Sequence, residues 1–250
     1  MRTQSLTLAA IFLCATLGTA SAQFGRGGGG MAAPPTGPNL GGANALLFGD
    51  NNSFTANFEM QSGSSQPMGG KISVSDGKSR FEFDMTKLAS GRNASSAAQL
   101  KQFGMDTVAS ISRPDKKTVY TLYPGLNAYF ETTIPDAPPA TAGKSKTDIS
   151  KLGTETIDGH PCAKNKIVVT DDNGATHEST VWNASDLKNF PLKIEQTEGG
   201  QKVTMTFKDV KLDKIDASLF EVPSGAKKYD SMMTLMQQEM MSRALRGRGQ

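Results

Sequence analysis

Residues 71–85 read KISVSDGKSRFEFDM, and this stretch decides the fold class. Apolar side chains alternate with polar ones on both sides of the pair Asp76-Gly77. The alternating apolar residues are Ile72, Val74, Phe81, Phe83 and Met85. Alternation with a period of two places successive side chains on opposite faces of a strand, and Asp-Gly suits the tight turn between paired strands. The stretch therefore predicts an antiparallel hairpin with one apolar face.

The same alternation continues along most of the chain. Residues 54–60 place Phe54, Ala56, Phe58 and Met60 on one face, and Val203, Met205 and Phe207 alternate with polar residues near the other end. Further strands are predicted at 107–112, 118–123, 128–134, 154–157, 163–170, 176–183, 192–198 and 202–210. Helical spacing predicts a short helix or an irregular crossover at 94–103, one helical turn at 216–219 and a final helix at 231–245, whereas 135–150 is interpreted as a long surface loop. The prediction is a mainly antiparallel β protein with minor α.

The composition fits one folded domain carried by an exported chain. Of 250 residues 37% are hydrophobic, and 27 lysines and arginines face 24 acids. Residues 1–22 have the pattern of a signal peptide, with Arg2, an apolar run and the small residues 20–22. Cleavage after Ala22 leaves 26 basic and 24 acidic residues, which argues against nucleic-acid binding. No other apolar run approaches the length of a transmembrane span; the alternative for 1–22 is an uncleaved anchor.

Three further regions complete the expected organisation. Residues 23–44 are rich in Gly and Pro and predict a flexible tether, with partner binding as the alternative. Residues 45–230 form the predicted β-sheet domain. Residues 231–250 combine a methionine-rich helix, holding five of the chain's twelve methionines, with a basic tail. Thioether side chains suit either core packing or contact with flexible hydrocarbon, and arginines near the end of a helix suit its dipole or anionic lipid head groups.

Most catalytic and cofactor chemistries lack the residues that they need. The two histidines, His160 and His177, are not in a metal-ligand spacing, so no metal site is expected. No phosphate-binding glycine loop and no Gly-x-Ser-x-Gly motif occurs, so no cofactor is expected. Cys14 lies in the signal after the large Leu13, which argues against a lipid anchor. Cys162 is interpreted as a small buried residue, with an intermolecular disulfide or a nucleophile as alternatives.

Several segments together resemble a family of exported bacterial proteins of unknown function whose domain is similar to the lipoprotein-carrier (LolA/LolB-like) fold. The segments that carry the resemblance are 79–82 with Met85, then 113–115, 152–162, 181–184, 190–195, 220–225 and 228–229. They include Arg80, Arg113, Trp182 and Phe220. The resemblance implies a strongly curved, incomplete β-barrel, or half-barrel, whose concave apolar face is covered by helices and holds acyl chains. It transfers no catalytic residue.

The resulting functional expectation is a non-enzymatic envelope protein, periplasmic or extracellular, that binds a lipid or another apolar ligand. The expected ligand-binding residues lie on the sheet and on the final helix: Phe58, Phe81, Phe83, Met205, Phe207, Met232, Met236 and Met240. One alternative is an interaction or scaffold protein that docks an envelope protein through loops or a strand edge. Another is a hydrolase built from scattered carboxylates or Cys162, which requires a polar pocket with neighbouring titratable groups.

Overall fold

The computed structural model describes residues 40, 42–89, 94–135, 146–170 and 174–247. All of them belong to one compact unit, Pro34–Gln250. The predicted signal peptide, nearly all of the predicted tether, and residues 136–145 of the predicted loop lie outside the described residues. No described helix is long and apolar enough to cross a bilayer.

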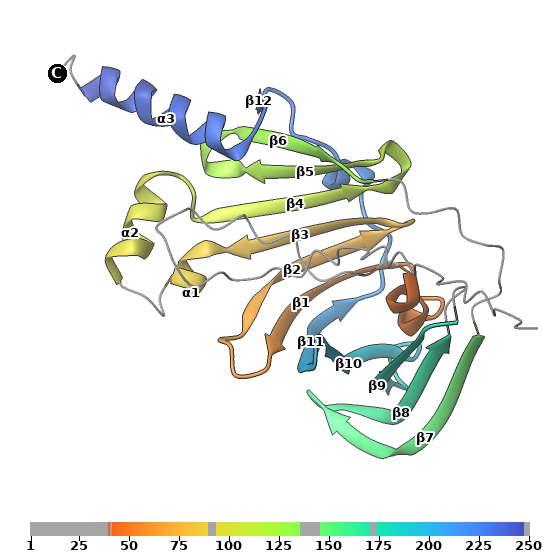
Figure 1. The fold of residues 1–250 in the computed structure, drawn as a ribbon. Coiled ribbons are helices and arrows are strands. Elements are labelled where there is room, and N and C mark those ends of the chain that lie inside the picture. The colour runs from red at the N-terminus through yellow and green to blue at the C-terminus, as the bar shows by residue number, and fades with distance from the viewer. Residues whose placement is uncertain (1–39, 41, 90–93, 136–145, 171–173, 248–250) are drawn as a thin grey trace, which may run out of the picture. The chain divides into compact units, whose positions relative to one another are not determined.

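The described residues form a single sheet of twelve strands in the order β12-β6-β5-β4-β3-β2-β1-β11-β10-β9-β8-β7 (Figure 1). Neighbouring strands are antiparallel except β12 and β6, which are parallel. The strands are β1 Ser53–Ser62, β2 Met68–Ser75, β3 Lys78–Asp84, β4 Thr107–Arg113, β5 Thr118–Tyr123, β6 Ala128–Thr133, β7 Lys146–Ile157, β8 His160–Thr170, β9 Thr176–Ala184, β10 Phe190–Glu198, β11 Gln201–Lys211 and β12 Lys227–Tyr229. The predicted hairpin is confirmed as β2 and β3, joined through Asp76 and Gly77, both at positive φ.

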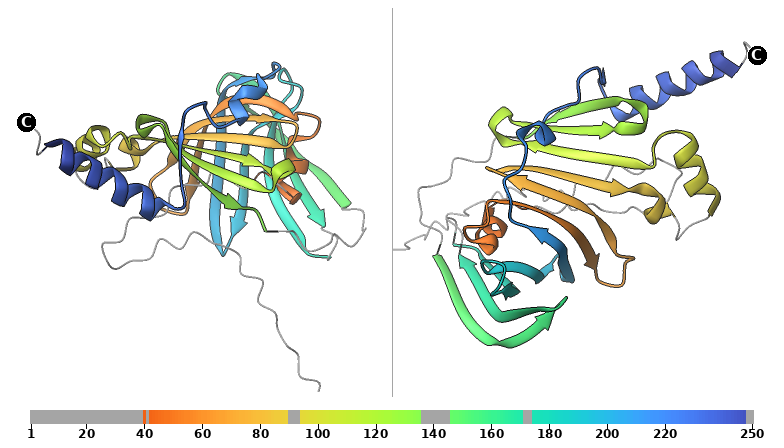
Figure 2. Two further views of the ribbon diagram at one scale, coloured as in Figure 1. Left: turned by 90° about the horizontal axis from the view of Figure 1, so that it is seen from above. Right: turned by 180° about the vertical axis from the view of Figure 1, so that it is seen from behind.

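Apart from α3, the helical elements are short, and the α-helices lie at the ends and edges of the sheet (Figures 1 and 2). The α-helices are α1 Met85–Ala89, α2 Ala94–Gln102 and α3 Met232–Gly247; the 3-10 helices are η1 Gly42–Phe48, η2 Pro114–Lys116, η3 Pro124–Leu126 and η4 Ala217–Phe220. The helices predicted at 94–103 and 231–245 are confirmed. The turn predicted at 216–219 is confirmed as η4, whose first amides are capped by the Asp216 carboxylate, 2.9 Å from the Ser218 amide nitrogen.

The sheet curls but does not close, because its end strands β12 and β7 are not neighbours. The curl gives an inner face, on which buried residues of strands from β8 to β3 meet in one cluster. On the outer face, Ala109 and Ile111 of β4 pack against Phe220 of η4. The mainly antiparallel, half-barrel architecture expected from the alternation and the family resemblance is therefore confirmed.

Four elements differ from the sequence predictions. The loop prediction is wrong for residues 146–150, which form the first part of the long edge strand β7. This strand is exposed over most of its length, so it lacks the apolar alternation that marks a half-buried strand. Helix η1 begins at Gly42, inside the predicted tether of 23–44, and its residues 45–48 had been assigned no element. The short elements α1 and β12 were not predicted, since five and three residues are too few to show a period.

Candidate functional site

Two rows of cross-strand neighbours make the inner face continuously apolar, and we call them the aromatic row and the methionine row. The aromatic row crosses five strands from β11 to β4: Phe207, Phe58, Gly70, Phe83 and Val108. The methionine row lies beside it on β10, β11, β1 and β2: Ile194, Met205, Met60 and Met68. Directly opposed residues of an antiparallel pair lie on the same face of the sheet. The inner face is therefore apolar from β10 to β4.

The aromatic row owes its packing to a glycine. Phe58 lies opposite Gly70, and a Cβ atom at Gly70 would be 3.2 Å from the Phe58 ring and 2.1 Å from the Glu82 carbonyl oxygen. Without a side chain at this position, the Phe58 ring packs edge-on against Phe81 and Phe83, with centroids 5.6 and 5.7 Å away. Such edge-to-face contacts are favourable beyond the area that they bury.

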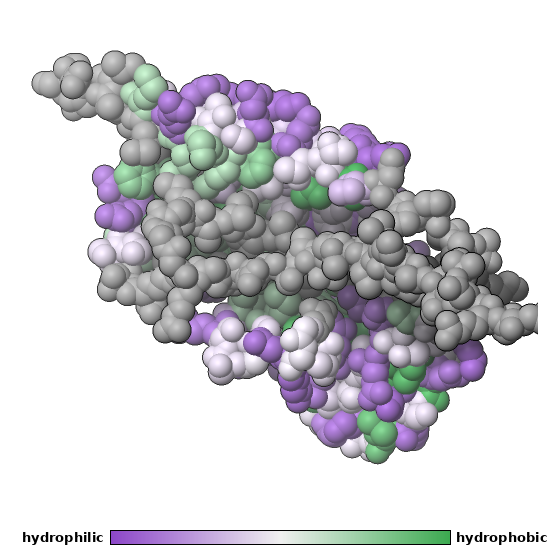
Figure 3. All heavy atoms as spheres, in the orientation of Figure 1, coloured by the Kyte–Doolittle hydropathy of each residue, from purple (hydrophilic) through white to green (hydrophobic). Residues whose placement is uncertain are grey.

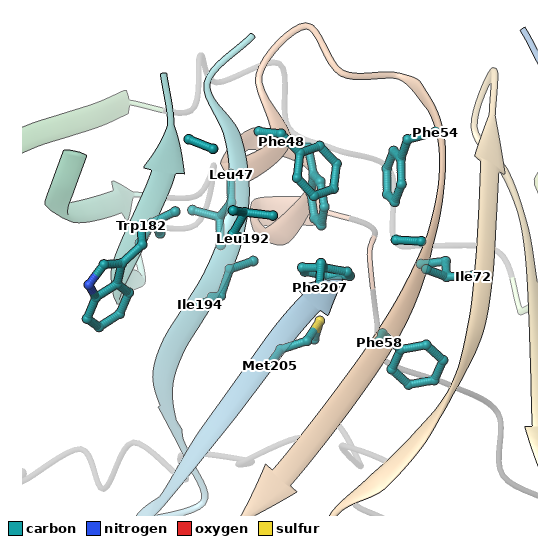
Figure 4. Packing of buried hydrophobic residues seen from close by; sticks show 14 of the residues in the cluster. Leu47, Phe48, Phe54, Phe58, Ile72, Trp182, Leu192, Ile194, Met205 and Phe207 are labelled. Atoms are coloured by element: carbon teal, nitrogen blue, oxygen red, sulfur yellow. The ribbon is translucent and has the colours of Figure 1, made fainter. Parts of the chain in front are cut away.

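Helix η1 closes one end of the inner face. Phe48 stacks on Phe54 with ring centroids 5.3 Å apart and meets Phe190 and Phe207 edge-on at 5.7 Å. Figure 4 shows Phe48 of η1 beside Phe54 and near Phe207 of the sheet. The sequence analysis missed this closure because it placed residues 45–48 in the β-sheet domain without assigning them an element, although the run Leu46-Leu47-Phe48 was an apolar signal.

The methionine row is the more adaptable part of the inner face. Met205 is buried, whereas Met60 and Met68 are only partly buried and pack at the border of the cluster. Met85, at the start of α1, contacts both this cluster and the neighbouring one. Unbranched thioether side chains fill irregular apolar spaces more readily than branched ones. The border formed by Met60, Met68 and Met85 can therefore follow the shape of a flexible apolar molecule.

The structure brings together only part of the predicted ligand site. Phe58, Phe81, Phe83, Met205 and Phe207 belong to one cluster on the inner face. The predicted residues of the final helix lie elsewhere: Met232 and Met236 pack on a second cluster around Tyr123, Phe130 and Tyr229 of β5, β6 and β12, and the Met240 side chain lies outside the described part. The structure therefore brings the five sheet residues together, whereas Met232 and Met236 of α3 pack at the β12 end.

Contacts of α3 with the sheet fix this position. The Tyr123 hydroxyl donates to the Met232 Sδ atom at 3.0 Å, and burial raises the pKa of Tyr123 to about 12. The Tyr229 hydroxyl donates to the Glu239 carboxylate at 2.7 Å. Leu235 between these contacts is fully buried. The start of α3 is thus part of the fold, and the cluster on which it packs reaches the aromatic row only at that row's last residue, Val108.

Two arginines from the segments that carry the family resemblance, Arg80 and Arg113, act on the outer face. Arg113 is buried, and its guanidinium donates to Asp115, to Glu221 and to the Phe220 carbonyl oxygen, the last at 3.1 Å. Arg80 on β3 donates to the Leu219 carbonyl oxygen at 3.2 Å. These two arginines hold η4 against the sheet.

A second outer-face group surrounds Trp182. Its indole nitrogen donates to the Glu155 carboxylate at 2.8 Å, and the ammonium groups of Lys164 and Lys193 lie 4.8 and 4.3 Å from the ring centroid. Trp182 and the two lysines are direct cross-strand neighbours on β8, β9 and β10. Each lysine also pairs with a carboxylate, Lys193 with Glu195 at 2.7 Å. The group therefore presents no unpaired charge to a ligand and stabilises the outer face.

The described residues contain no group of three or more His, Cys, Asp or Glu that could hold a metal ion. Cys162 is buried and has no disulfide partner, and its Sγ donates to the His160 carbonyl oxygen at 3.4 Å. Burial raises the pKa of the Cys162 thiol, which disfavours the nucleophilic thiolate. The interpretation of Cys162 as a small buried residue is confirmed.

An open cleft of about 830 Å³ lies on another part of the surface, between the start of β1, the β2–β3 turn and residues 212–217. Its charged lining residues are of both signs: Asp76, Asp213, Asp216, Lys78 and Lys214. Asp216 is already engaged by the Ser218 amide. The mixed charges and open form point to no particular ligand.

No protein-family model matches the chain, and no curated protein matches it either. Solved structures with a similar fold include an uncharacterised conserved protein from Thermus thermophilus, at 12% identity over 75% of this chain and 96% of that one, with a TM-score of 0.43. The lipoprotein LppX of Mycobacterium tuberculosis is similar at 10% identity over 69% and 94% of the two chains, with a TM-score of 0.42. A LolA superfamily protein from Nitrosomonas europaea is similar at 12% identity over 70% and 92%, with a TM-score of 0.30.

Proposed function

We propose that the protein is an exported, non-enzymatic binder of a flexible apolar ligand, such as an acyl chain, on the inner face of its sheet. The observation that carries the proposal is the pair of adjacent rows on that face, one aromatic and one of methionines. The methionine row ends in Met60 and Met68, which oppose one another on β1 and β2 and stay partly exposed. A ligand that enters there meets apolar side chains along both rows.

The chemistry of these rows favours hydrocarbon over polar ligands. Each methylene group moved from water to an apolar surface contributes about 0.8 kcal/mol, so about 12 methylenes contribute roughly 10 kcal/mol before the costs of binding. Affinity then depends on apolar area and needs few hydrogen bonds. The Cys162 thiol does not compete as a nucleophilic site, since it is buried and its pKa is raised.

The test is binding of a fluorescent fatty acid, 11-(dansylamino)undecanoic acid, to the chain from Gln23 onward, combined with native mass spectrometry of protein purified without detergent. We expect saturable binding and a co-purifying acyl-chain adduct. The double variant Met60→Asp/Met68→Asp places two carboxylates at the border of the inner face, and we expect it to weaken probe binding at least about tenfold.

The matched control is Ile149→Asp/Leu152→Asp on the edge strand β7. These side chains are 64% and 53% exposed, so the control introduces the same charges away from the inner face. We expect it to bind the probe normally. Equal weakening in both double variants, or a chain without adduct that takes up no probe, would contradict the proposal.

A second function, docking of an envelope protein, is favoured by β7. It is the last strand of the sheet, it runs over twelve residues, and it exposes Ile149 and Leu152. An exposed edge strand can accept an extended peptide through its backbone groups. If no apolar ligand binds, the second function gains support from a partner protein that the unaltered chain captures. The Ile149→Asp/Leu152→Asp variant should then fail to retain that partner.

A further inference from the structure

The groups of the candidate site that an oxidant can reach are thioethers. Cys162 is buried and the pKa of its thiol is raised, so it reacts poorly with oxidants. Met60 and Met68 are instead partly exposed at the border of the inner face. They oppose one another directly on β1 and β2, and directly opposed residues have their Cβ atoms about 4.5–5.5 Å apart. The border that suits a flexible hydrocarbon is therefore also a pair of neighbouring, oxidisable side chains.

Exposure sets the order in which the methionines can react. Met233 and Met241 on α3 are 79% and 60% exposed, and in Figure 3 hydrophobic residues in green reach the surface over α3 among hydrophilic residues in purple. Met205, which belongs to the same row as Met60 and Met68, is buried. Met60 and Met68 lie between these extremes. A dissolved oxidant should therefore reach the two methionines of α3 first, then Met60 and Met68, and Met205 last.

A sulfoxide at Met60 or Met68 does not suit the surface around it. Oxidation replaces an apolar thioether by a polar group, and its oxygen needs a hydrogen-bond donor when it leaves water. The residues beside the pair on this face include Met205, Phe58 and Gly70, which offer no side-chain donor. The backbone of β1 is engaged on both sides, by β2 and by β11. The sulfoxide oxygen must therefore turn towards water, and the border loses its apolar character.

We propose that Met60 and Met68 form a reversible oxidation site, at which hydrogen peroxide converts the two thioethers to sulfoxides and thereby releases the apolar ligand. In each reaction the sulfur lone pair attacks one oxygen of the peroxide, so that an S–O bond forms and the O–O bond breaks. The leaving hydroxide takes the proton of the transferred oxygen. Sulfur thus loses two electrons, and the peroxide is reduced to water. The inference rests on the proposed function, because it adds regulation to the same border of the inner face.

The experiment treats the chain from Gln23 onward with hydrogen peroxide, removes the excess with catalase, and follows two quantities in each sample. Peptide mass spectrometry measures the sulfoxide at each methionine, and titration with 11-(dansylamino)undecanoic acid measures the probe affinity. We expect the affinity to fall at least about tenfold as Met60 and Met68 are oxidised. It should stay unchanged while only Met233 and Met241 are oxidised. Dithiothreitol with the two epimer-specific methionine sulfoxide reductases should restore it.

Two variants locate the effect. Met60→Leu/Met68→Leu removes both sulfur atoms but keeps apolar side chains of similar volume, so it should bind the probe both before and after peroxide treatment. The matched control Met233→Leu/Met241→Leu removes two exposed thioethers from α3. It should lose affinity on oxidation as the unaltered chain does. Far-UV circular dichroism of each treated chain checks that the sheet persists.

Several results would overturn the proposal. They are sulfoxides at Met60 and Met68 without a fall in affinity, an equal fall in Met60→Leu/Met68→Leu, loss of the sheet on oxidation, or a fall that the reductases do not reverse. Oxidation of Met205 before Met60 and Met68 would also contradict it, since the pair would then be the less accessible. An untreated chain that binds no probe refutes the proposed function and the inference with it, whereas normal binding that survives oxidation of the pair refutes only the inference.

Discussion

Replacement of Arg113 by methionine should destabilise the protein by about 2 kcal/mol, because it removes a hydrogen-bond donor to a buried carbonyl group. The Arg113 side chain is 7% exposed and donates to the Phe220 carbonyl oxygen at 3.1 Å. An acceptor left unsatisfied in a buried position costs about 1–3 kcal/mol. The lost ion pairs with Asp115 and Glu221 add little, since both carboxylates are about half exposed and become hydrated.

The matched control is Arg80→Met on the neighbouring strand. Arg80 makes the same kind of bond to the Leu219 carbonyl oxygen at 3.2 Å, but this contact is exposed, so water replaces the guanidinium. We expect a cost below about 1 kcal/mol for the control. The assay is urea denaturation followed by far-UV circular dichroism and by the fluorescence of Trp182, the single tryptophan. Hydrogen exchange should accelerate at residues 217–220 in Arg113→Met only.

The pH dependence gives an independent check of the ion pairs. The hydrogen bond from Arg113 lowers the pKa of Asp115 from 3.8 to about 2, and Arg113 also lowers the pKa of Glu221. A carboxyl group whose pKa is lower in the folded state stabilises the fold above its unfolded pKa, and this stabilisation is lost as pH falls through the folded pKa. The difference between wild type and Arg113→Met should therefore shrink as pH falls from about 4 towards 2. A difference that increases as pH falls over that range, or equal costs in Arg113→Met and Arg80→Met, would refute the reasoning.

Three further predictions concern single positions. Gly70→Ala should destabilise the protein by about 1–3 kcal/mol in urea denaturation, because its Cβ would be 2.1 Å from the Glu82 carbonyl oxygen, and a cost below about 0.5 kcal/mol would contradict the close approach. Cys162 should react with Ellman's reagent at least about 100-fold more slowly in the native than in the urea-unfolded protein at pH 8, because burial raises its pKa and limits access; equal rates would contradict its burial. Hydrogen bonds from Lys164 and Trp182 lower the pKa of Glu155 below 4.5. The change in Trp182 fluorescence on acidification should therefore have its midpoint below pH 4.5 and should disappear in Glu155→Gln. A midpoint above pH 4.5 would exclude Glu155 as the group that causes the change.

The sheet was predictable from the sequence wherever strands are half buried. Phe54, Ala56 and Phe58 alternate with polar residues because one face of β1 meets the cluster and the other meets solvent. The signal fails where both faces have the same environment. Strand β7 is exposed on both sides, so its first residues, 146–150, have the composition of a loop. Alternation of apolar and polar residues reveals a strand only when its two faces have different environments. A strand that is exposed on both faces is therefore not detected by this pattern.

The sequence predicted the apolar character of the candidate site, but it did not predict which of the apolar residues lie together. The five predicted sheet residues lie in one cluster because alternate residues of a strand share a face and directly opposed residues of neighbouring strands share it too. The position of α3 was not predictable, since its methionines suit several apolar partners equally well. The anchors that place α3 on β12 and β5 are Tyr229 and Tyr123, whose partners Glu239 and Met232 show no signal in the sequence. Only the three-dimensional arrangement separates the sheet residues from the helix residues.

The outer and inner faces of the sheet differ in how far the stability of the fold explains their residues, and this difference bears on function. On the outer face, the charged groups described around Arg113 and Trp182 have partners, so that face is explained by stability alone. On the inner face, the aromatic row is also explained by packing, but the partly exposed Met60 and Met68 at its side are not. Branched residues, which are the usual choice for strands, would pack there with less conformational freedom to lose. Two flexible thioethers opposed on β1 and β2 gain an advantage only if the molecule beside them varies in shape, as a hydrocarbon chain does. The inner-face border is therefore where mutation should separate ligand binding from stability.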